Sequence, residues 1–578
     1  MDMVTTATPP KSKRLSLQVE TIGADTTAIR SLDWDRDRFD IEFGLQNGTT
    51  YNSFLIQADK TALVDTSHAK FRELYIPRLQ ELIDLQTLDY LIISHTEPDH
   101  SGLVRDILEL APQVTVVGSK VALQFLDDFV HRPYQRWQVK QGDQIDLGRG
   151  HVLEFISAPN LHWPDTMLTW DHATRILFTC DVFGMHYCRE TLYDESLTEI
   201  EDDFRYYYDC LMGPNARSVL AALKRLAPLG QPSLIATGHG PLLRYHIPDW
   251  IDRYRHWSEN QEKSGTTIAV FYVADYGYSD RLSQAIAHGI TKTGTAVEMV
   301  DMKAAELQDV RELVERSQGV VIGMPPVSGE WAEHLRAVIG TILGSVHAKQ
   351  SFGLFESGGG QDDNIHLLAA KLRDLGLTMA FPPLRLDSAP TPATYQRAEE
   401  AGTDLGQWVN RDRTIQQMKS LDNDLDRALG RLSSGLYIIT ARQGDRSGAM
   451  LASWVSQASF QPLGLTIAVA KDRAIEALMQ VGDTFVLNVL EAGNYQHLMK
   501  HFLKRFGPGE DRFAGVKTQP AKNGSPILAE ALAYLECTVA SRMECSDHWI
   551  VYATVQDGRV AKPDGLTAVH HRKVGNHY

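Results

Sequence analysis

A dense cluster of potential metal ligands constrains this sequence more than any other feature. His95, Glu97, Asp99 and His100 lie within six residues of one another, directly after the apolar run of residues 88–94. A short apolar run rich in branched side chains predicts a buried strand, so the four side chains emerge at its carboxyl end. Because carboxylates rarely gather without compensating charge, the cluster predicts a strand-end site that holds metal.

Three more potential ligands, His162, Asp181 and His239, each follow another apolar run. These predicted strands occupy residues 152–156, 175–180 and 233–237. A single histidine after a strand is usually an ordinary surface or core residue. Loops at strand ends, however, converge on rigid supports. Four histidines and three carboxylates at four strand ends therefore indicate one site with a pair of divalent metals.

Charge and cysteine usage exclude several classes of protein. The chain carries 57 basic and 73 acidic residues, a formal charge of −16, so it repels a phosphate backbone and we expect no nucleic-acid partner. No apolar run approaches the roughly 20 residues of a membrane span, and the first 23 residues lack the apolar stretch of a secretory signal. Five scattered cysteines without a C-x-x-C motif favour a reducing compartment. We expect a cytoplasmic protein.

The 578 residues are too many for one core, and the pattern changes along the chain. Short β-rich runs fill residues 28–260, after an expected tail at residues 1–27. Strands and helices alternate over residues 265–408, which predicts a parallel doubly wound sheet. After a charged linker at residues 409–424, strands follow one another directly over residues 425–578, which predicts a closed or sandwiched β structure.

The loop at residues 272–280 joins the first strand of the second block to a helix, where free N–H groups and the helix dipole attract an anion. Gly277 allows close approach, and Ser279 can donate its hydroxyl to a phosphate. Two later strand-end loops, residues 323–326 and 356–360, would flank a planar ring. A plain strand–helix turn is the alternative. The candidate cofactor contacts are Ala274, Asp275, Tyr276, Gly277, Tyr278, Ser279, Pro325, Pro326, Ser357, Gly358 and Gly359.

The third block contains a second candidate cofactor surface. Residues 450–462 alternate polar and apolar side chains, and on a strand this alternation directs serine and glutamine groups to one side. Lys471 and Arg473 would add positive charge for a phosphate. The alternative is a half-buried strand with a polar solvent face. The candidate contacts are Ser453, Trp454, Ser456, Gln457, Lys471, Arg473, Asn488 and His548.

The ligand pattern of the first block resembles the metallo-β-lactamase fold and, within it, the flavodiiron branch. Zinc hydrolases of this fold carry H-x-H-x-D-H, whereas Glu97 fills the second position here and makes the site harder and more anionic, which suits iron. The resemblance implies one iron on His95, Glu97 and His162, a second on Asp99, His100 and His239, and Asp181 as the bridge. It also implies that His186 lies beside the site, the alternative being an ordinary buried histidine.

The other two blocks carry resemblances of their own. The second resembles flavodoxin and implies FMN, although Ala274 and Tyr278 stand where Ser and Asn are common. The third resembles the split β-barrels of the NAD(P)H:flavin oxidoreductase family, with His548 in the position of its G-D-H motif and Ser546 in place of Gly. This resemblance implies a second flavin, FMN or FAD, with NAD(P)H as the electron donor.

The whole chain resembles the modular flavodiiron proteins of cyanobacteria, of the diflavin flavoprotein A type. The implied fold combines a metallo-β-lactamase-like αββα domain, a flavodoxin-like doubly wound domain and a C-terminal flavin-reductase split β-barrel. The implied activity passes electrons from NAD(P)H, or a photosynthetic donor, through flavin to a diiron site that reduces dioxygen to water.

The family also implies a head-to-tail homodimer, or a hetero-oligomer with a sister flavodiiron protein, because the FMN of one subunit faces the diiron site of another. Three alternatives remain open. Nitric oxide reduction would use the same ligands, and a hydrolase would use the same fold. A non-catalytic hetero-oligomer partner would keep these residues around an unoccupied metal site.

Overall fold

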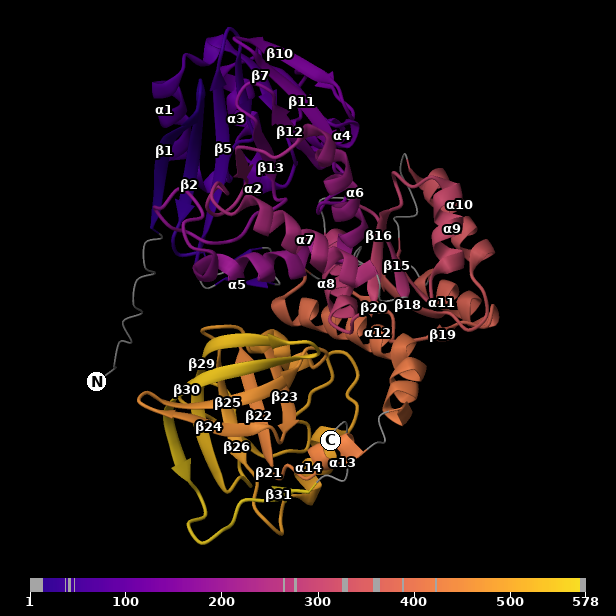
Figure 1. Cartoon of the computed structure of the whole chain (residues 1–578). Coiled ribbons are helices and arrows are strands. Elements are labelled where there is room, and N and C mark those ends of the chain that lie inside the picture. The colour runs from indigo at the N-terminus through magenta and orange to yellow at the C-terminus, as the bar shows by residue number, and fades with distance from the viewer. Residues whose placement is uncertain are drawn as a thin grey trace, which may run out of the picture. The chain divides into compact units, whose positions relative to one another are not determined.

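The structure is a computed structural model. It describes residues 14–36, 38–39, 43–45, 47–262, 266–274, 278–324, 331–356, 364–386, 389–420 and 424–571. The chain divides into two compact units, Met1–Lys263 and Ser264–Tyr578, and each is considered by itself (Figure 1).

The first unit is built on two β-sheets. The larger has the order β1-β2-β5-β6-β7-β8-β9 and the smaller the order β10-β11-β12-β13-β14. The strands of the larger sheet are β1 (Leu15–Gly23), β2 (Thr26–Asp33), β5 (Thr49–Gln57), β6 (Thr61–Val64), β7 (Leu88–Ile92), β8 (Thr115–Gly118) and β9 (Gln135–Gln138). The smaller sheet contains β10 (Gln144–Gly148), β11 (His151–Ser157), β12 (Met167–Asp171), β13 (Ile176–Cys180) and β14 (Leu234–Thr237). A short pair, β3 (Arg38–Phe39) and β4 (Phe43–Gly44), stands apart from both.

The two sheets pack face to face, because each presents an apolar face to the other. Phe54 of β5 and Phe178 of β13 meet at the centre of the shared core, with ring centroids 5.2 Å apart. Helices cover both outer faces, which gives the αββα layers that the family resemblance implies (Figure 1). The larger sheet is covered by α1 (Arg72–Leu82), α3 (Val104–Leu110) and α4 (Lys120–Val130). The smaller sheet is covered by α5 (Leu197–Tyr207), α6 (Ala216–Leu226) and α7 (Ile247–Glu262).

The expected N-terminal tail over residues 1–27 is wrong for the part that forms β1. This strand pairs antiparallel with β2, from Leu15 opposite Asp33 to Gly23 opposite Thr26. Its alternate residues Leu15, Leu17 and Val19 pack against the core beneath the larger sheet. Alternating apolar side chains are typical of a half-buried edge strand, and they explain why this segment forms a strand and not a tail.

The second unit opens with a parallel sheet of order β16-β15-β17-β18-β19, with β20 also pairing with β18. This order is that of a doubly wound flavodoxin-like fold, as the alternation of strands and helices predicted. Its strands are β15 (Thr267–Tyr272), β16 (Ala296–Asp301), β17 (Gly319–Gly323), β18 (Ser351–Glu356), β19 (Thr378–Met379) and β20 (Leu384–Arg385). Its helices are α8 (Tyr278–Thr291), α9 (Leu307–Arg316), α10 (Ala332–Ser345), α11 (Asn364–Asp374) and α12 (Pro392–Ser420). Because α12 runs on to Ser420, most of the expected linker at residues 409–424 is helical.

The C-terminal β domain of this unit has a seven-stranded antiparallel sheet of order β23-β22-β26-β29-β30-β25-β24. Met450 and Ile467, on strands far apart in this order, share one core, so the sheet curls around it. The strands are β22 (Tyr437–Gln443), β23 (Arg446–Ala452), β24 (Val455–Phe460), β25 (Leu463–Ala470), β26 (Thr484–Val489), β29 (Ala533–Cys545) and β30 (His548–Val560). Shorter elements are α13 (Asp424–Leu429), β21 (Ser434–Gly435), α14 (Gln496–Leu503), β27 (Thr518–Pro520), β28 (Pro526–Leu528) and β31 (Val569–His570).

The single strand expected at residues 450–462 is wrong. The chain leaves the strand at Ser453 and Trp454, so β23 pairs with β22 whereas β24 pairs with β25 at the other edge of the sheet.

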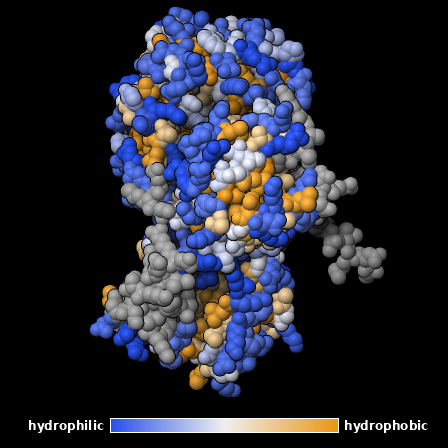
Figure 2. Space-filling model, turned by 90° about the vertical axis from the view of Figure 1, so that its right-hand side faces the viewer, coloured by the Kyte–Doolittle hydropathy of each residue, from blue (hydrophilic) through white to orange (hydrophobic). Residues whose placement is uncertain are grey.

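The surface in Figure 2 is mostly hydrophilic, with separate apolar areas. Among the helices of the described residues, none is both long and apolar enough to cross a bilayer.

Candidate metal centre

All seven candidate metal ligands gather at one edge of the two sheets. Parallel pairing brings the carboxyl ends of β6, β7 and β8 to one edge of the larger sheet, and those of β13 and β14 to one edge of the smaller. His95 and Glu97 follow β7, and Asp99 and His100 lie in the one-turn helix α2 (Pro98–Ser101). His162 lies between β11 and β12, Asp181 follows β13, and His239 follows β14.

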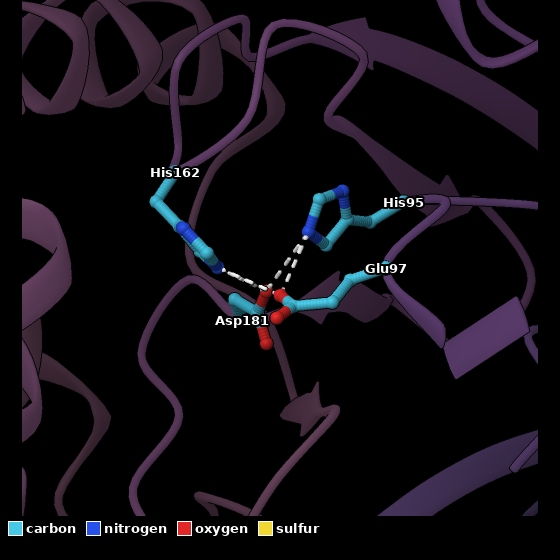
Figure 3. A group of neighbouring side chains, drawn as sticks. All are labelled: His95, Glu97, His162 and Asp181. Atoms are coloured by element: carbon cyan, nitrogen blue, oxygen red, sulfur yellow. Dashed lines mark hydrogen bonds and ion pairs between the residues drawn. The ribbon is translucent and has the colours of Figure 1, made fainter. Parts of the chain in front are cut away.

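One half of the centre contains His95, Glu97 and His162, which point toward Asp181 (Figure 3). The Nε2 atom of His162 lies 3.0 Å from Glu97 Oε2 and 3.4 Å from Asp181 Oδ2. The Nε2 atom of His95 lies 3.3 Å and 3.6 Å from the same two oxygens. Two imidazole nitrogens and two carboxylate oxygens therefore surround one small volume.

The other half contains Asp99, His100 and His239, and it uses the second oxygen of Asp181. Asp181 Oδ1 lies 3.0 Å from His100 Nε2 and 3.3 Å from His239 Nε2. Asp99 places Oδ1 3.5 Å from His100 Nε2 and Oδ2 3.4 Å from His239 Nε2. The two oxygens of Asp181 thus face different halves of the centre.

Hydrogen bonds behind the histidines fix which ring nitrogen is free. His239 Nδ1 lies 2.6 Å from the carbonyl oxygen of Thr50, which can only accept, so this nitrogen carries the proton. His95 Nδ1 lies 2.9 Å from Asp165 Oδ1, while Asp165 Oδ2 accepts from the backbone N–H of Thr96. Both rings can therefore direct an Nε2 lone pair at carboxylate oxygens. An Nε2 lone pair that faces a carboxylate oxygen is repulsive unless a proton or a metal cation lies between the two atoms, so the residues fit a metal.

The pKa values of these groups describe the same charge balance. Burial lowers the pKa of His162, but Glu97 and Asp181 outweigh it and raise this pKa to about 10. Burial likewise lowers the pKa of His239, and its bonds to Asp181 and Asp99 raise it to about 10. Burial raises the pKa of Asp181, but His100 and the other imidazoles bring it well below the usual value. Metal cations at this site would replace the protons of the imidazoles.

The donor chemistry favours a metal that accepts nitrogen and oxygen. Four imidazoles and three carboxylates line the centre, and Glu97 makes it more anionic than a histidine would. Cys180 also lies within reach of His100 and Asp181. Burial raises the pKa of its thiol well above the usual value, and nearby carboxylates add to this shift, so it stays a neutral thiol.

His186 and Tyr207 stand beside the centre. The His186 ring lies 4.5 Å from the His239 ring, and its Nδ1 atom is 2.7 Å from Thr49 Oγ1. Burial and the neighbouring His239 hold the pKa of His186 well below the usual value, so it is neutral. Sequence reasoning missed Tyr207, Asp165 and Thr50. Only the Asp165 position carried a signal, because it lies three residues after His162.

The structure describes only part of the predicted phosphate loop. The candidate residues 275–277, 325–326 and 357–359 lie outside the described residues. Ala274 is buried, with its N–H bonded to Asp301 and its carbonyl oxygen to Lys303. Tyr278 is exposed and Ser279 is buried, both at the start of α8.

The C-terminal β domain brings together some of its candidate contacts. The Trp454 ring lies 5.2 Å from the His548 ring, and Ser453 is buried next to them. The Ser453 hydroxyl has no hydrogen-bond partner in the described part of the chain. An aromatic pair beside a free buried hydroxyl fits the edge of a planar cofactor.

Of the remaining candidates in this domain, Lys471 lies beside His548, because its backbone N–H bonds the carbonyl oxygen of Asp547. Ser456 and Gln457 are exposed on β24, Arg473 is exposed, and Lys471 is ion-paired with Glu544. The prediction that Asn488 contacts a cofactor is wrong. It is fully buried in β26, donates to Ile438 O and Thr440 Oγ1, and accepts from the N–H of Leu528. Its amide is therefore engaged inside the domain and is not available to a ligand.

Three family models match successive parts of the chain. An ODP family beta lactamase model matches residues 49–240, a flavodoxin model residues 270–402, and a flavin reductase like domain model residues 429–576. These matches cover the αββα unit, the doubly wound sheet and the C-terminal β domain in turn.

Full-length relatives give the same assignment. "Diflavin flavoprotein A 1" of Synechocystis sp. is 66% identical over 576 residues and covers 100% of both chains. "Putative diflavin flavoprotein A 3" of Nostoc sp. is 66% identical and covers 99% of both. A solved structure, the metal soaked Flv1 flavodiiron core from Synechocystis sp. PCC6803, is 36% identical with a TM-score of 0.65, over 69% of this chain and 99% of that one. The chain therefore belongs to the diflavin flavoprotein A family, with a flavodiiron core followed by a flavin reductase domain.

Proposed function

We propose that this chain passes electrons from NAD(P)H through two flavins to a two-iron centre that reduces dioxygen to water. Two NAD(P)H molecules supply four electrons, and with four protons these convert one dioxygen to two waters. Bound flavins would supply the conversion of a two-electron hydride into single electrons, and a bound iron pair would supply the site of dioxygen reduction. The observation that carries the proposal is the position of Asp181, with one oxygen toward each ligand set.

The chain's own residues have defined parts in this proposal. His95, Glu97 and His162 would hold one iron and Asp99, His100 and His239 the other, with Asp181 between them. Asp165 and the Thr50 carbonyl orient two of the imidazoles, which supports tight and specific metal binding. Trp454 and His548, beside Ser453, offer a surface for the flavin that accepts hydride. The loop before α8 would hold FMN.

The proposal includes an assembly. Family resemblance favours a head-to-tail dimer in which the FMN of one copy serves the centre of the other. A sister flavodiiron protein would fill the same place in a hetero-oligomer. Mass measurement of the purified protein, alone and mixed with such a sister chain, tests both forms.

The substitution Asp181→Ala tests the function. We expect it to abolish dioxygen consumption and to lower bound iron, because each half of the centre loses an oxygen ligand. Flavin content and NAD(P)H-driven flavin reduction should stay at wild-type levels. Loss of both reactions together, or dioxygen uptake that survives, would contradict the proposal. Parallel turnover with nitric oxide on the wild-type protein decides which gas is the better substrate.

A further inference from the structure

A polar stripe runs along the last helix of the flavodoxin-like domain. Gln396, Glu400, Asp404 and Gln407 on α12 are spaced by four, four and three residues, so they share one face of the helix. We call these four residues the docking stripe. Each of them contacts the C-terminal β domain, which belongs to the same compact unit.

The helix that carries the docking stripe is held tightly to its own domain. A Cβ atom on Gly402 of α12 would lie 1.9 Å from the backbone oxygen of Ile286 on α8. A Cβ atom on Gly289 of α8 would likewise lie 1.9 Å from the backbone oxygen of Glu399. The two helices therefore meet backbone to backbone. The docking stripe is a rigid part of the flavodoxin-like domain.

The two acidic members of the stripe pair with basic residues of the β domain. Glu400 places Oε1 3.0 Å from the Arg512 guanidinium, and Oε2 accepts from the backbone N–H of Gly509 at 2.8 Å. The side chains of Glu400 and Arg512 are 7% and 11% exposed. Asp404 pairs with Arg505 at 3.2 Å, in a more exposed position at the rim.

The two amide members bond on either side of these charges. Gln396 Nε2 donates to the carbonyl oxygen of Ser447 at 2.9 Å, just after the start of β23. Gln407 Nε2 donates to Asp472 Oδ2 at 2.8 Å, in the turn after β25. The β domain thus meets the stripe with a strand and separate loops, and these contacts join complementary groups.

A second set of charges lies beside the stripe. Lys292, just after α8, places Nζ 2.6 Å from Glu399 of α12 and 2.7 Å from Glu476 of the β domain. Arg542 of β29 completes the set by pairing with Glu476. The Lys292 and Glu476 side chains are nearly buried. Separation of the domains would leave Lys292 paired with Glu399 and Glu476 paired with Arg542, and it would break the Lys292–Glu476 ion pair that joins the two domains.

We propose that the docking stripe and Lys292 form a charge-complementary docking surface that binds the C-terminal β domain of the same chain, and that this docking is required for electrons to pass between the flavins of the two domains. The second part rests on the proposed function. Isolated surface ion pairs contribute little, but Glu400 is shielded from water and both of its oxygens are bonded. The contact should therefore survive physiological salt and weaken in molar salt.

A charge exchange tests the docking. Glu400→Arg and Arg512→Glu each bring like charges together, whereas the double variant restores an opposite pair. In the full-length protein, we expect each single variant to raise hydrogen exchange at residues 505–512 and along α12 at least tenfold, and the double variant to recover most of the protection. Arg316→Glu is the matched control, because Arg316 pairs with Glu298 on the flavodoxin-like domain only. Single variants that exchange like this control, or a double variant without recovery, would overturn the docking.

Electron passage is measured on the same proteins by stopped-flow absorbance with NAD(P)H. The first flavin should bleach at the wild-type rate in every variant, and the second should bleach at least tenfold more slowly in the single variants and recover in the double one. A normal second rate in a variant that has lost protection would overturn the requirement for docking. Glu400→Gln, which keeps the shape of the side chain, provides the same reading if a reversed charge prevents folding. If the first flavin does not bleach in the wild type, the proposed function is contradicted. The hydrogen-exchange data would still test the docking independently.

Discussion

The phenolic hydroxyl of Tyr207 donates a 2.8 Å hydrogen bond to Asp181 Oδ1, the oxygen that also faces His100 and His239. Tyr207 ends α5, and its buried ring belongs to the core under the smaller sheet, so helix packing directs the hydroxyl. Burial and the negative charge of Asp181 raise the pKa of Tyr207 well above its usual value. The hydroxyl therefore remains a donor at physiological pH.

Tyr207→Phe should leave iron bound but reduce turnover, because the Asp181 carboxylate loses its only phenolic donor among the described residues. We expect a loss of about 1–3 kcal/mol in the stability of the first unit. We also expect dioxygen consumption to fall roughly tenfold, as about 1.4 kcal/mol in the barrier would give. Iron per chain, the thermal midpoint and the oxygen electrode provide the measurements. Tyr208→Phe is the matched control, since Tyr208 is equally buried but bonds Ser258. Equal activity in the two variants would contradict a role for Tyr207 at the centre.

Asp165→Asn should weaken iron binding without removing a ligand. The two oxygens of Asp165 accept from His95 Nδ1 and from Thr96, and an amide can serve only one of them as an acceptor. The His95 ring would then lose its fixed tautomer, and we expect about 10- to 100-fold weaker metal binding. Competition with a chelator measures this change.

Asp171→Asn is its control, because Asp171 accepts from His151 Nδ1 at 2.9 Å in an equally buried pair on β11 and β12. This variant should lose stability but keep its affinity for iron. Equal affinities in the two variants would mean that the bond from Asp165 does not orient His95.

Asp65 should make the first unit less stable as the pH rises. Burial raises the pKa of its carboxyl from 3.8 to about 6, although His100 opposes the shift. The folded state therefore binds the proton more tightly than the unfolded state does. For this group alone, the stability is highest below about pH 3, and about 3 kcal/mol is lost between about pH 3 and about pH 7.

Asp65→Asn removes this titration and keeps an oxygen that can accept from the Ser94 N–H. The stability of wild type relative to the variant should thus fall by that amount over the same pH range. Hydrogen exchange of the β6 and β7 amides, corrected for intrinsic rates, measures the difference. A constant difference across this range would show that the carboxyl does not titrate there.

Lys292→Met should strongly destabilise the second unit. The Lys292 side chain is 9% exposed and neutralises Glu399 and Glu476, and these carboxylates hold its pKa above the usual value despite burial. Its loss leaves two buried carboxylates without this partner, at a cost of about 3–5 kcal/mol. Differential scanning calorimetry should show a lower midpoint for the second unit only. Lys522→Met, which removes the exposed pair with Asp557, should leave that midpoint unchanged. Equal midpoints in both variants would contradict the structural importance of Lys292.

The sequence predicted the layers of the fold well where apolar patterns were strong. The runs at residues 267–272 and 484–489 coincide with β15 and β26. The sequence pattern wrongly predicted a cofactor contact at Asn488, whose side chain bonds inside the sheet. It also wrongly predicted a continuous strand through Ser453, where the chain crosses from one edge of the sheet to the other. Local alternation cannot reveal either feature, because both depend on which strands become neighbours.

The sequence by itself determined the candidate ligand types and their places after strands, since each of them lies in the loop or short turn that follows a run of apolar residues. Only the tertiary structure decided which groups stand behind them. His239 bonds Thr50 across 189 positions and His95 bonds Asp165 across 70. It also decided what the docking stripe meets, because Glu400 and Arg512 lie 112 positions apart. Such contacts form when sheets and helices pack their apolar faces together, and no local pattern specifies which polar side chains that packing brings into contact.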